Sequence, residues 1–298
     1  MVFVDVLLPV FLVGGVGYAF GRLTRAEVES LTKLAFYVLS PALIFHSLYT
    51  STVSGREIGI TALFVAVLHL VLFGLALLGG RFLSWESDTR VAAALSLSNN
   101  NAGSYGLSVL LFAFGENGFA LGVVYMLALL VFQTIFGVGI ASWKEGTSVR
   151  RFVLSVLKVP WFHALGLALI LRGLAIELPT ALLSPIKLVA QAAIPVFLLL
   201  LGIQLSRVKL GGVLSQAASI AATKLLLPPL LAFGLTAVFG VGSLLRAVLI
   251  IEASTPTAIN TLILALKYQR RPDLVAFVVF LTTVGSVLTM GIVLALLV

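Results

Sequence analysis

The chain has 298 residues, of which 60% are hydrophobic and only 10% are charged, and its mean hydropathy is +1.18. A soluble protein of this length needs far more polar surface, so the composition excludes a soluble globular fold and predicts a polytopic membrane protein. The formal net charge is +8, but the basic residues lie in short loops between apolar runs, which indicates membrane topology and no nucleic-acid partner.

Chemistry that depends on cysteine is also excluded. The chain has no cysteine and three scattered histidines, with no HExxH spacing. It therefore predicts no disulfide, thiolate nucleophile, metal site or cofactor.

Ten apolar runs follow one another, each near the ~20 residues that a membrane-spanning helix needs. They lie at 3–20, 31–49, 58–79, 90–112, 118–141, 159–176, 183–205, 213–239, 246–267 and 273–297. The prediction is an all-α fold of ten transmembrane helices in the lipid bilayer.

The second and third runs each contain one residue that is unusual in a membrane helix. Pro41 has no backbone N–H to donate, so we expect it to kink or unwind the second helix, unless it is one of the ordinary kinks of membrane helices. His69, in the third run, is a candidate for proton coupling, although an isolated membrane histidine is more often a hydrogen-bonded interior group.

The fourth run is interrupted at its middle by the polar stretch Ser98 to Gly106. Hydrocarbon cannot satisfy the backbone groups of a broken helix, so such a break is tolerated only inside protein or beside a cavity. The candidate substrate-binding residues of this break are Asn99, Asn100, Asn101, Gly103 and Ser104.

The ninth run, 246–267, has a matching break, and its candidate substrate-binding residues are Thr255, Pro256, Thr257 and Asn260. In both runs the polar centre starts nine residues after an arginine. Two breaks at corresponding places in two halves of a transporter point to a substrate site between inverted repeats. The helices predicted to be broken are therefore helices 4 and 9.

Charged groups within the second-half runs are few. Glu252 is the one carboxylate well inside a run, which makes it a candidate for binding a proton or a cation. Lys224, in the eighth run, is the candidate partner of Glu252 or of a substrate anion, and His69 is its approximate counterpart in the first half. The alternative is that Glu252 is a structural acid, either protonated or paired.

The chain divides into two five-helix repeats, at 1–143 and 159–298, joined by a basic cytoplasmic linker at 144–158. Lys33 precedes Pro41 by eight residues, as Lys187 precedes Pro195, which is the expected kink of the seventh helix. Because five is an odd number, the second repeat is inverted relative to the first.

The basic residues predict the orientation. With the N-terminus outside, 14 of them fall on the cytoplasmic side and four on the external side, with Lys224 inside a run. This split predicts external termini in a bacterial-type inner membrane.

The broken helices also predict the ligand. Their N-terminal ends present free N–H groups and a partial positive charge, which favour an anion, typically a carboxylate. The amides and hydroxyls of the two breaks supply neutral donors, unless they only cap the broken ends.

A family resemblance follows from these motifs. The sequence from Asn100 to Leu107, together with the stretches 112–116, 123–125 and 252–261, resembles the two crossovers of bacterial auxin efflux carrier family permeases. The resemblance implies a ten-helix, five-plus-five inverted-repeat fold, shared with plant auxin carriers and more distantly with bile acid:sodium symporters. It also implies elevator-type secondary transport of organic anions. Ser108 and Met126 stand where these permeases often have proline and glutamine, so the two positions can alter substrate choice.

The leading hypothesis is therefore a secondary transporter of a small organic anion. A proton or a sodium ion is the candidate coupled ion, and the protein can form a homodimer or act as a monomer. A sodium-coupled symporter of the bile acid type is the second hypothesis, although Pro256 stands where those symporters have a sodium-coordinating side chain. An intramembrane enzyme needs a catalytic dyad that the sequence does not offer. A channel is disfavoured because no selectivity-filter motif occurs.

Overall fold

The computed structural model describes residues 3–24, 27–133, 160–208 and 214–298. In this part of the chain the fold is entirely helical, apart from one isolated β-bridge. Seven of its helices are long and apolar enough to cross a membrane. The linker predicted at 144–158, and the part of the fifth run beyond residue 133, lie outside the described residues.

The first half begins with two long helices that include π-helical turns. The π-helix η1 (Phe3–Leu7) runs directly into α1 (Leu8–Leu23). The segments α2 (Val28–Leu34), η2 (Ala35–Leu39) and α3 (Ser40–Thr50) then follow without interruption as the second helix. A capping box between Ser54 and Glu57 starts α4 (Gly55–Phe82) by satisfying backbone N–H groups at its N-terminal end.

The predicted break in the fourth run is present. Helix α5 (Ser87–Ser98) ends before three non-helical residues, and η3 (Ala102–Gly106) continues into α6 (Leu107–Phe132). The separation that the sequence predicts between the fourth and fifth runs lies at Gly115, whose φ of 61° interrupts α6. Glycine reaches this left-handed conformation without a steric penalty.

The second half has six helical segments among the described residues. Helix α9 (Pro160–Gly173) is followed by α10 (Thr180–Leu205), α11 (Leu214–Phe239) and α12 (Ser243–Ala253). After the second break come α13 (Asn260–Lys267) and α14 (Pro272–Leu297).

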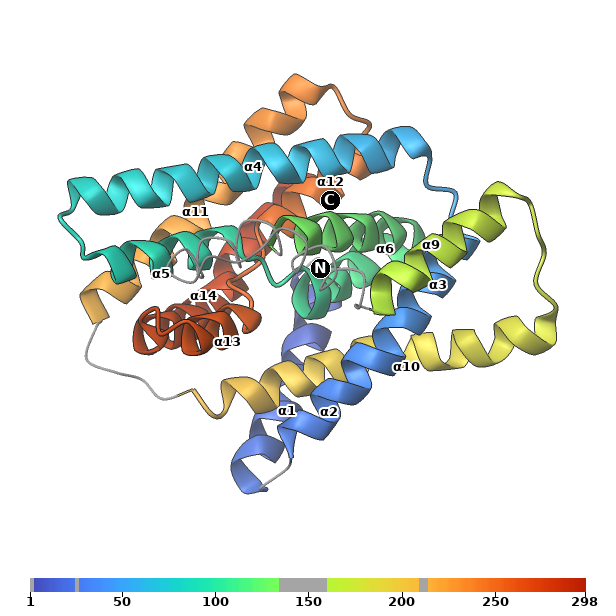
Figure 1. Cartoon of the computed structure of the whole chain (residues 1–298), viewed down its shortest axis with the longest axis horizontal. Coiled ribbons are helices and arrows are strands. Elements are labelled where there is room, and N and C mark those ends of the chain that lie inside the picture. Colours follow the sequence, from blue (N-terminus) through green and yellow to red (C-terminus); the bar gives the residue numbers. More distant parts are fainter. Residues whose placement is uncertain (1–2, 25–26, 134–159, 209–213) are drawn as a thin grey trace.

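The helices pack as two bundles, each drawn from both halves of the chain (Figure 1). In the flanking bundle, α10 packs against α1 and α3, and α3 packs against α9. In the figure α1 and α3 are blue, α9 is yellow-green and α10 is yellow. In the crossover bundle, α4, α5 and α6 pack with α11, α12 and α14. The first two long helical segments of each half therefore build the flanking bundle, and the later ones build the crossover bundle.

Close backbone contact joins the two halves within the flanking bundle. A Cβ at Gly202 of α10 would lie 1.9 Å from the Gly14 carbonyl oxygen of α1, and one at Gly17 would lie 2.2 Å from the Leu199 oxygen. Only glycine fits at such distances. Small residues allow membrane helices to gain dispersion contacts that lipid does not replace.

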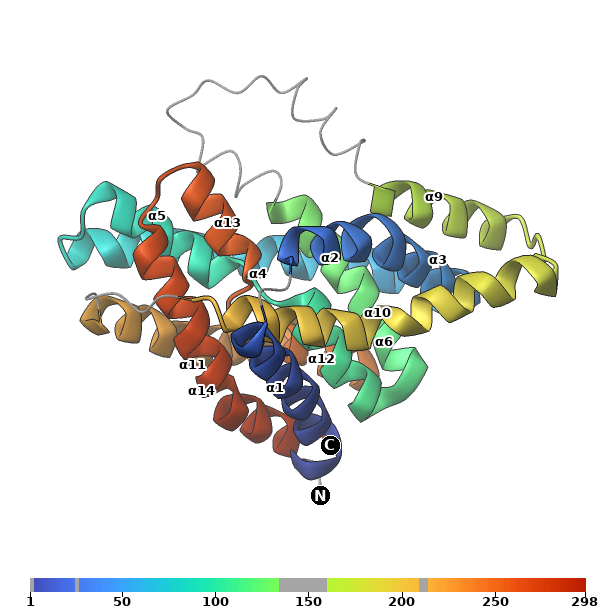
Figure 2. The ribbon, with the colours of Figure 1, turned by 90° about the horizontal axis from the view of Figure 1, so that it is seen from below.

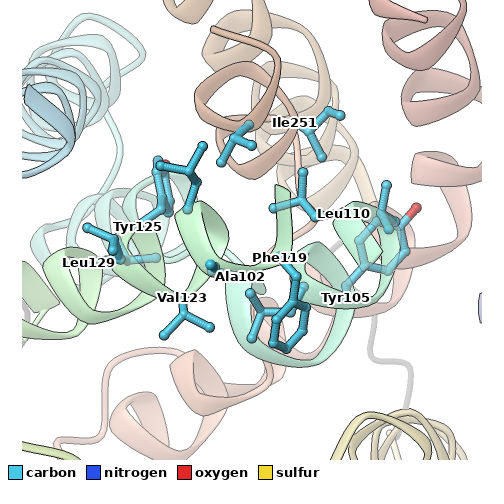
Figure 3. Packing of buried hydrophobic residues seen from close by; sticks show 14 of the residues in the cluster. Ala102, Tyr105, Leu110, Phe119, Val123, Tyr125, Leu129 and Ile251 are labelled. Atoms are coloured by element: carbon cyan, nitrogen blue, oxygen red, sulfur yellow. The ribbon is translucent and has the colours of Figure 1, made fainter. Parts of the chain in front are cut away.

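The start of η1 and the end of α14 lie close together in both views (Figures 1 and 2). The principal core includes residues of both bundles. The part of it where η3, α6 and α12 meet contains Tyr105, Tyr125 and Ile251 (Figure 3). This packing holds the two breaks at the centre of the molecule.

Candidate functional site

The two chain breaks meet and hydrogen-bond to each other. Asn100 and Thr257 form an antiparallel β-bridge. The Asn101 N–H donates to the Pro256 carbonyl oxygen at 2.9 Å, and the Ala258 N–H donates to the Asn99 oxygen at 3.0 Å. Backbone groups that the broken helices leave unpaired are thus satisfied by the opposite break, as burial requires.

The Asn100 side chain ties the first break to the end of α12. Its Nδ2 donates to the carbonyl oxygens of Glu252, at 2.7 Å, and Ala253, at 3.0 Å. The Asn100 Oδ1 accepts a hydrogen bond from the Lys224 ammonium. This amide therefore bonds to residues of α11 and α12 at once.

Two threonines of the second break make hydrogen bonds that stabilise the crossover. The Thr257 hydroxyl donates to the Ser96 carbonyl oxygen at 2.9 Å, and its backbone N–H donates to Thr282 Oγ1 at 3.2 Å. The Thr255 hydroxyl donates to the Glu252 carbonyl oxygen at 2.8 Å. Both side chains are fully buried and have their bonds within the protein.

A cavity of about 150 Å³ lies between the two bundles at the crossover. Of the nine predicted substrate-binding residues, Asn100, Asn101, Gly103, Ser104 and Asn260 line it. The buried Nδ2 of Asn101 has no hydrogen-bond partner among the described residues.

The other four predicted substrate-binding residues, Asn99, Thr255, Pro256 and Thr257, do not line the cavity. Asn99, Pro256 and Thr257 join the two breaks through the bonds described above, and the Thr255 hydroxyl bonds within its own break. The sequence prediction did not separate the cavity-lining residues from those that hold the crossover together.

Several lining residues were missed by the sequence prediction. They come mainly from the flanking bundle, where a single polar or aromatic residue near a helix end gives little signal. They are Thr32, Ala35, Phe36, Ser40, Trp161, Phe197, Leu200 and Gln204, together with Ala102, Leu129, Leu130, Gln133, Ala258 and Ile259 of the crossover. Met126, which the family resemblance had singled out, lines the cavity too.

Pro41 follows a π-helical segment and does not break the helix. In that segment the Ser40 N–H donates to the Ala35 oxygen, five residues back. The same pattern would direct the Pro41 nitrogen to the Phe36 oxygen, but proline has no N–H. The Trp161 Nε1–H donates to the Phe36 oxygen instead, at 2.8 Å, and both residues line the cavity.

Pro195, the expected counterpart, lies inside α10, which runs as one helix from Thr180 to Leu205. The two prolines therefore differ in their local backbone. The matched spacing in the sequence did not foresee the π-helical turns, because it contains no information on hydrogen-bond register.

The Glu252 carboxyl group is buried beside two glycines and away from the cavity. A Cβ at Gly106 would lie 2.2 Å from Glu252 Oε2, and one at Gly122 would lie 3.2 Å from Oε1. Both carboxyl oxygens are without a hydrogen-bond partner among the described residues. The absent side chains at these glycines leave the space that the carboxyl group fills.

Lys224 is not paired with Glu252. Its ammonium donates to the Leu97 carbonyl oxygen at 3.0 Å and to Asn100 Oδ1. His69 Nδ1 bonds to its own helix, to the Val65 oxygen at 2.8 Å, and its ring packs against Tyr125. Within the described residues the three candidate coupling groups are all fully buried, but no hydrogen bond or ion pair joins any two of them.

The cavity continues toward one end of the bundles. Thr32 and Gln204, which line it, also line an adjoining hollow with Glu27, Lys33 and Arg207. These residues belong to α2 and the residue before it, and to the C-terminal end of α10 and the turn after it, on the side that the basic residues predict to be cytoplasmic.

Residues 2–294 match the family model described as membrane transport protein, the auxin efflux carrier family. The chain belongs to this family.

Two archaeal relatives of this membrane transport family cover almost the whole chain. An uncharacterized transporter of Methanothermobacter thermautotrophicus is 26% identical over 95% of this chain and 94% of its own length. An uncharacterized transporter of Methanocaldococcus jannaschii is 27% identical over 98% of this chain and 97% of its own length. The family and both names indicate an integral membrane transporter, a class that is generally not enzymatic.

The two departures from the auxin efflux carrier pattern lie in different places. Met126 lines the cavity, and a Cβ at Gly103 would lie 3.2 Å from its sulfur. The Ser108 hydroxyl of α6 donates to the carbonyl oxygen of Ser104 in η3 at 2.8 Å, and Ser108 does not line the cavity.

Proposed function

We propose that this protein is a secondary transporter that carries a small organic anion, of the carboxylate class, through the crossover of the two broken helices. The observation that supports this most directly is the cavity between the bundles, which is lined by residues from both breaks, Asn100, Asn101 and Asn260 among them.

The lining suits an anion. The helices that begin at Ala102 and at Asn260 present their N-terminal ends to the cavity. Unpaired N–H groups and the partial positive charge at such ends favour a carboxylate. The free Nδ2 of Asn101 adds a neutral donor.

The size of the cavity supports a small substrate. A closed apolar cavity of ~150 Å³ in another protein accommodates benzene, and the cavity here has about 150 Å³. Phe36, Trp161 and Met126 supply apolar surface. A monocarboxylate with a short aliphatic or small aromatic group matches both parts of the lining.

The transport mechanism that fits this architecture is elevator-type alternating access. We infer ten spans in two inverted five-helix repeats, with the crossover bundle moving against the flanking bundle. The division of both halves between the two bundles supports this, and so do the neighbouring chain ends, because an even number of spans places both ends on the same side of the membrane. With external termini, the cavity opens toward the cytoplasm.

Sodium-coupled symport is the second candidate, because the two Glu252 oxygens lack partners. A proton on Glu252 accounts for the same observation, since burying an unpaired carboxylate is costly. Pro256 contributes only a backbone carbonyl, which the Asn101 N–H already uses. We therefore favour proton coupling or no coupled ion.

The test has two steps. The purified protein is screened by thermal shift against monocarboxylates, dicarboxylates and indole acids, because a ligand of the folded state raises the melting temperature. The stabilising acids are then measured as radiolabelled substrates in proteoliposomes. Saturable flux of one of them is expected, and carboxylates that neither stabilise nor move would refute the proposal.

A further inference from the structure

The charged group of Lys224 lies at the negative ends of two half-helices. Lys224 belongs to α11 and is fully buried, and its ammonium donates to the Leu97 carbonyl oxygen and to Asn100 Oδ1. Leu97 is the second-last residue of α5, so its carbonyl is one of the last four that have no partner within their helix.

Asn100 brings the second half-helix to the same point. Its Nδ2 donates to the carbonyl oxygens of Glu252 and Ala253, the last two residues of α12. These two bonds fix the amide orientation, so Oδ1 faces Lys224. The C-terminal ends of α5 and α12, each with a partial negative charge, thus converge on one ammonium.

This is the chemistry of a cation site. Transporters with discontinuous helices use unwound carbonyls and C-terminal half-helix ends to coordinate sodium. A backbone carbonyl and an amide oxygen are also the hard oxygen ligands that metal cations such as Ca²⁺ take. Here the lysine side chain reaches both oxygens from a third helix.

We propose that the Lys224 ammonium acts as a cation that is covalently attached to the protein. It occupies the position where a coupled metal cation would otherwise balance the partial negative charge of the two half-helix ends. The inference deepens the proposed function and rests on it, because it assigns how a transporter of this kind works without sodium. It predicts that the intact protein has no sodium site at the Leu97 and Asn100 oxygens. It also predicts that removal of the lysine side chain creates one.

The neighbouring ionisable groups do not provide an alternative partner for this ammonium. His69, from α4, bonds through Nδ1 to the Val65 oxygen of its own helix, and its ring adjoins Asn100 and Lys224 as a neutral or cationic group, never as an anion. The Glu252 carboxyl group lies against Gly106 and Gly122, while only its backbone carbonyl takes part in the Asn100 contacts. The lysine therefore meets oxygen dipoles and no formal negative charge.

The experiment compares Lys224→Ala, which opens the space and removes the charge, with Lys224→Met, which removes the charge but fills the space. Melting temperatures are measured in NaCl and in choline chloride at equal ionic strength, and binding of ²²Na⁺ is measured by scintillation proximity. We expect sodium to raise the melting temperature of Lys224→Ala by about 2 °C or more. We expect no sodium-specific change in Lys224→Met or in the wild-type protein.

Saturable ²²Na⁺ binding to the wild-type protein at millimolar concentration would overturn the proposal, whether or not the variants fold. An equal response of Lys224→Ala and Lys224→Met to sodium would overturn it as well. Should Lys224→Ala fail to fold in either salt, Lys224→Ser takes its place with the same two criteria. None of these measurements needs a substrate. They can therefore refute the role of Lys224 while carboxylate transport is confirmed, and they can support that role while no carboxylate is transported.

Discussion

Asn100 and Thr257 lie opposite each other as an antiparallel pair, and this pairing makes the two chain breaks a single structure. Each break satisfies backbone groups of the other: the Asn101 N–H bonds to the Pro256 oxygen, and the Ala258 N–H bonds to the Asn99 oxygen. A helix end that is buried in a membrane protein needs such partners. The crossover can therefore carry polar groups at its centre without exposing unpaired backbone to lipid.

The pairing also assigns different roles to neighbouring asparagines. We predict that Asn101→Ala and Asn260→Ala each weaken or abolish transport without unfolding the protein, because both residues line the cavity. Loss of one hydrogen bond to a charged ligand costs roughly 1.5–3 kcal/mol, or about tenfold to a hundredfold in affinity. The measurement is the concentration dependence of carboxylate flux in proteoliposomes.

Asn117→Ala is the matched control for these variants, since Asn117 is an exposed asparagine of α6 outside the cavity lining. It should transport like the wild type. Wild-type kinetics in both Asn101→Ala and Asn260→Ala would remove these residues from the substrate site.

Glu252 is predicted to be the group that responds to a coupled ion. Its carboxyl group is buried in a span without a hydrogen-bond partner in the described structure, so a change in its protonation or occupancy has a large energetic effect. Glu252→Gln keeps the shape and removes the charge. We expect it to stop transport or to make the flux independent of the pH gradient.

Flux of the wild type and of Glu252→Gln, measured across several pH gradients with sodium and with potassium, separates the alternatives. A wild-type pH response in Glu252→Gln would show a structural acid. Strict sodium dependence of the wild type would contradict our preference for a proton or no coupled ion.

The space around this carboxyl group gives an independent prediction. A Cβ at Gly106 would lie 2.2 Å from Glu252 Oε2, so Gly106→Ala must displace the acid. We expect Gly106→Ala to lower the melting temperature in the wild-type background and to lower it less in a Glu252→Ala background. Neighbouring residues show such coupling in a double-mutant cycle, typically 0.5–3 kcal/mol. Additive effects would mean that the glycine does not provide space for the acid.

The sequence predicted the crossover because a broken membrane helix needs polar and helix-breaking residues, and these stand out against apolar runs. The positions of Asn101 and Asn260 at a cavity follow from that signal. The hydrogen bond between Trp161 and the Phe36 carbonyl could not be predicted from the sequence. It depends on the π-helical segment that ends just before Pro41. Lys224 was expected to pair with Glu252 or with a substrate anion. The pair with Glu252 is not present, because two charges in neighbouring runs carry no information on which helix faces they occupy.

Met126 is predicted to influence which carboxylate is bound. It lines the cavity next to Gly103, at a position where similar permeases often have glutamine. Met126→Gln replaces apolar surface by an amide, so acids with an apolar side group should lose affinity relative to more polar acids. A difference of one methylene contact is worth about 1–3 kcal/mol. Thermal-shift series with both kinds of acid measure the change, and Met126→Leu, which keeps an apolar lining, should retain the wild-type order.

The orientation is predicted to place the loop between α3 and α4 outside the cell and residue 148 inside it, because 14 basic residues fall on one side and four on the other. The chain has no cysteine, so single introduced cysteines report their location without background. Thr52 is the suitable external position: it is exposed, whereas the neighbouring Ser54 caps α4 and should be kept. In intact cells a membrane-impermeant maleimide should label Thr52→Cys and not Ser148→Cys, and permeabilisation should expose the second site. The opposite pattern would invert the topology, and the cavity described above would then open to the outside.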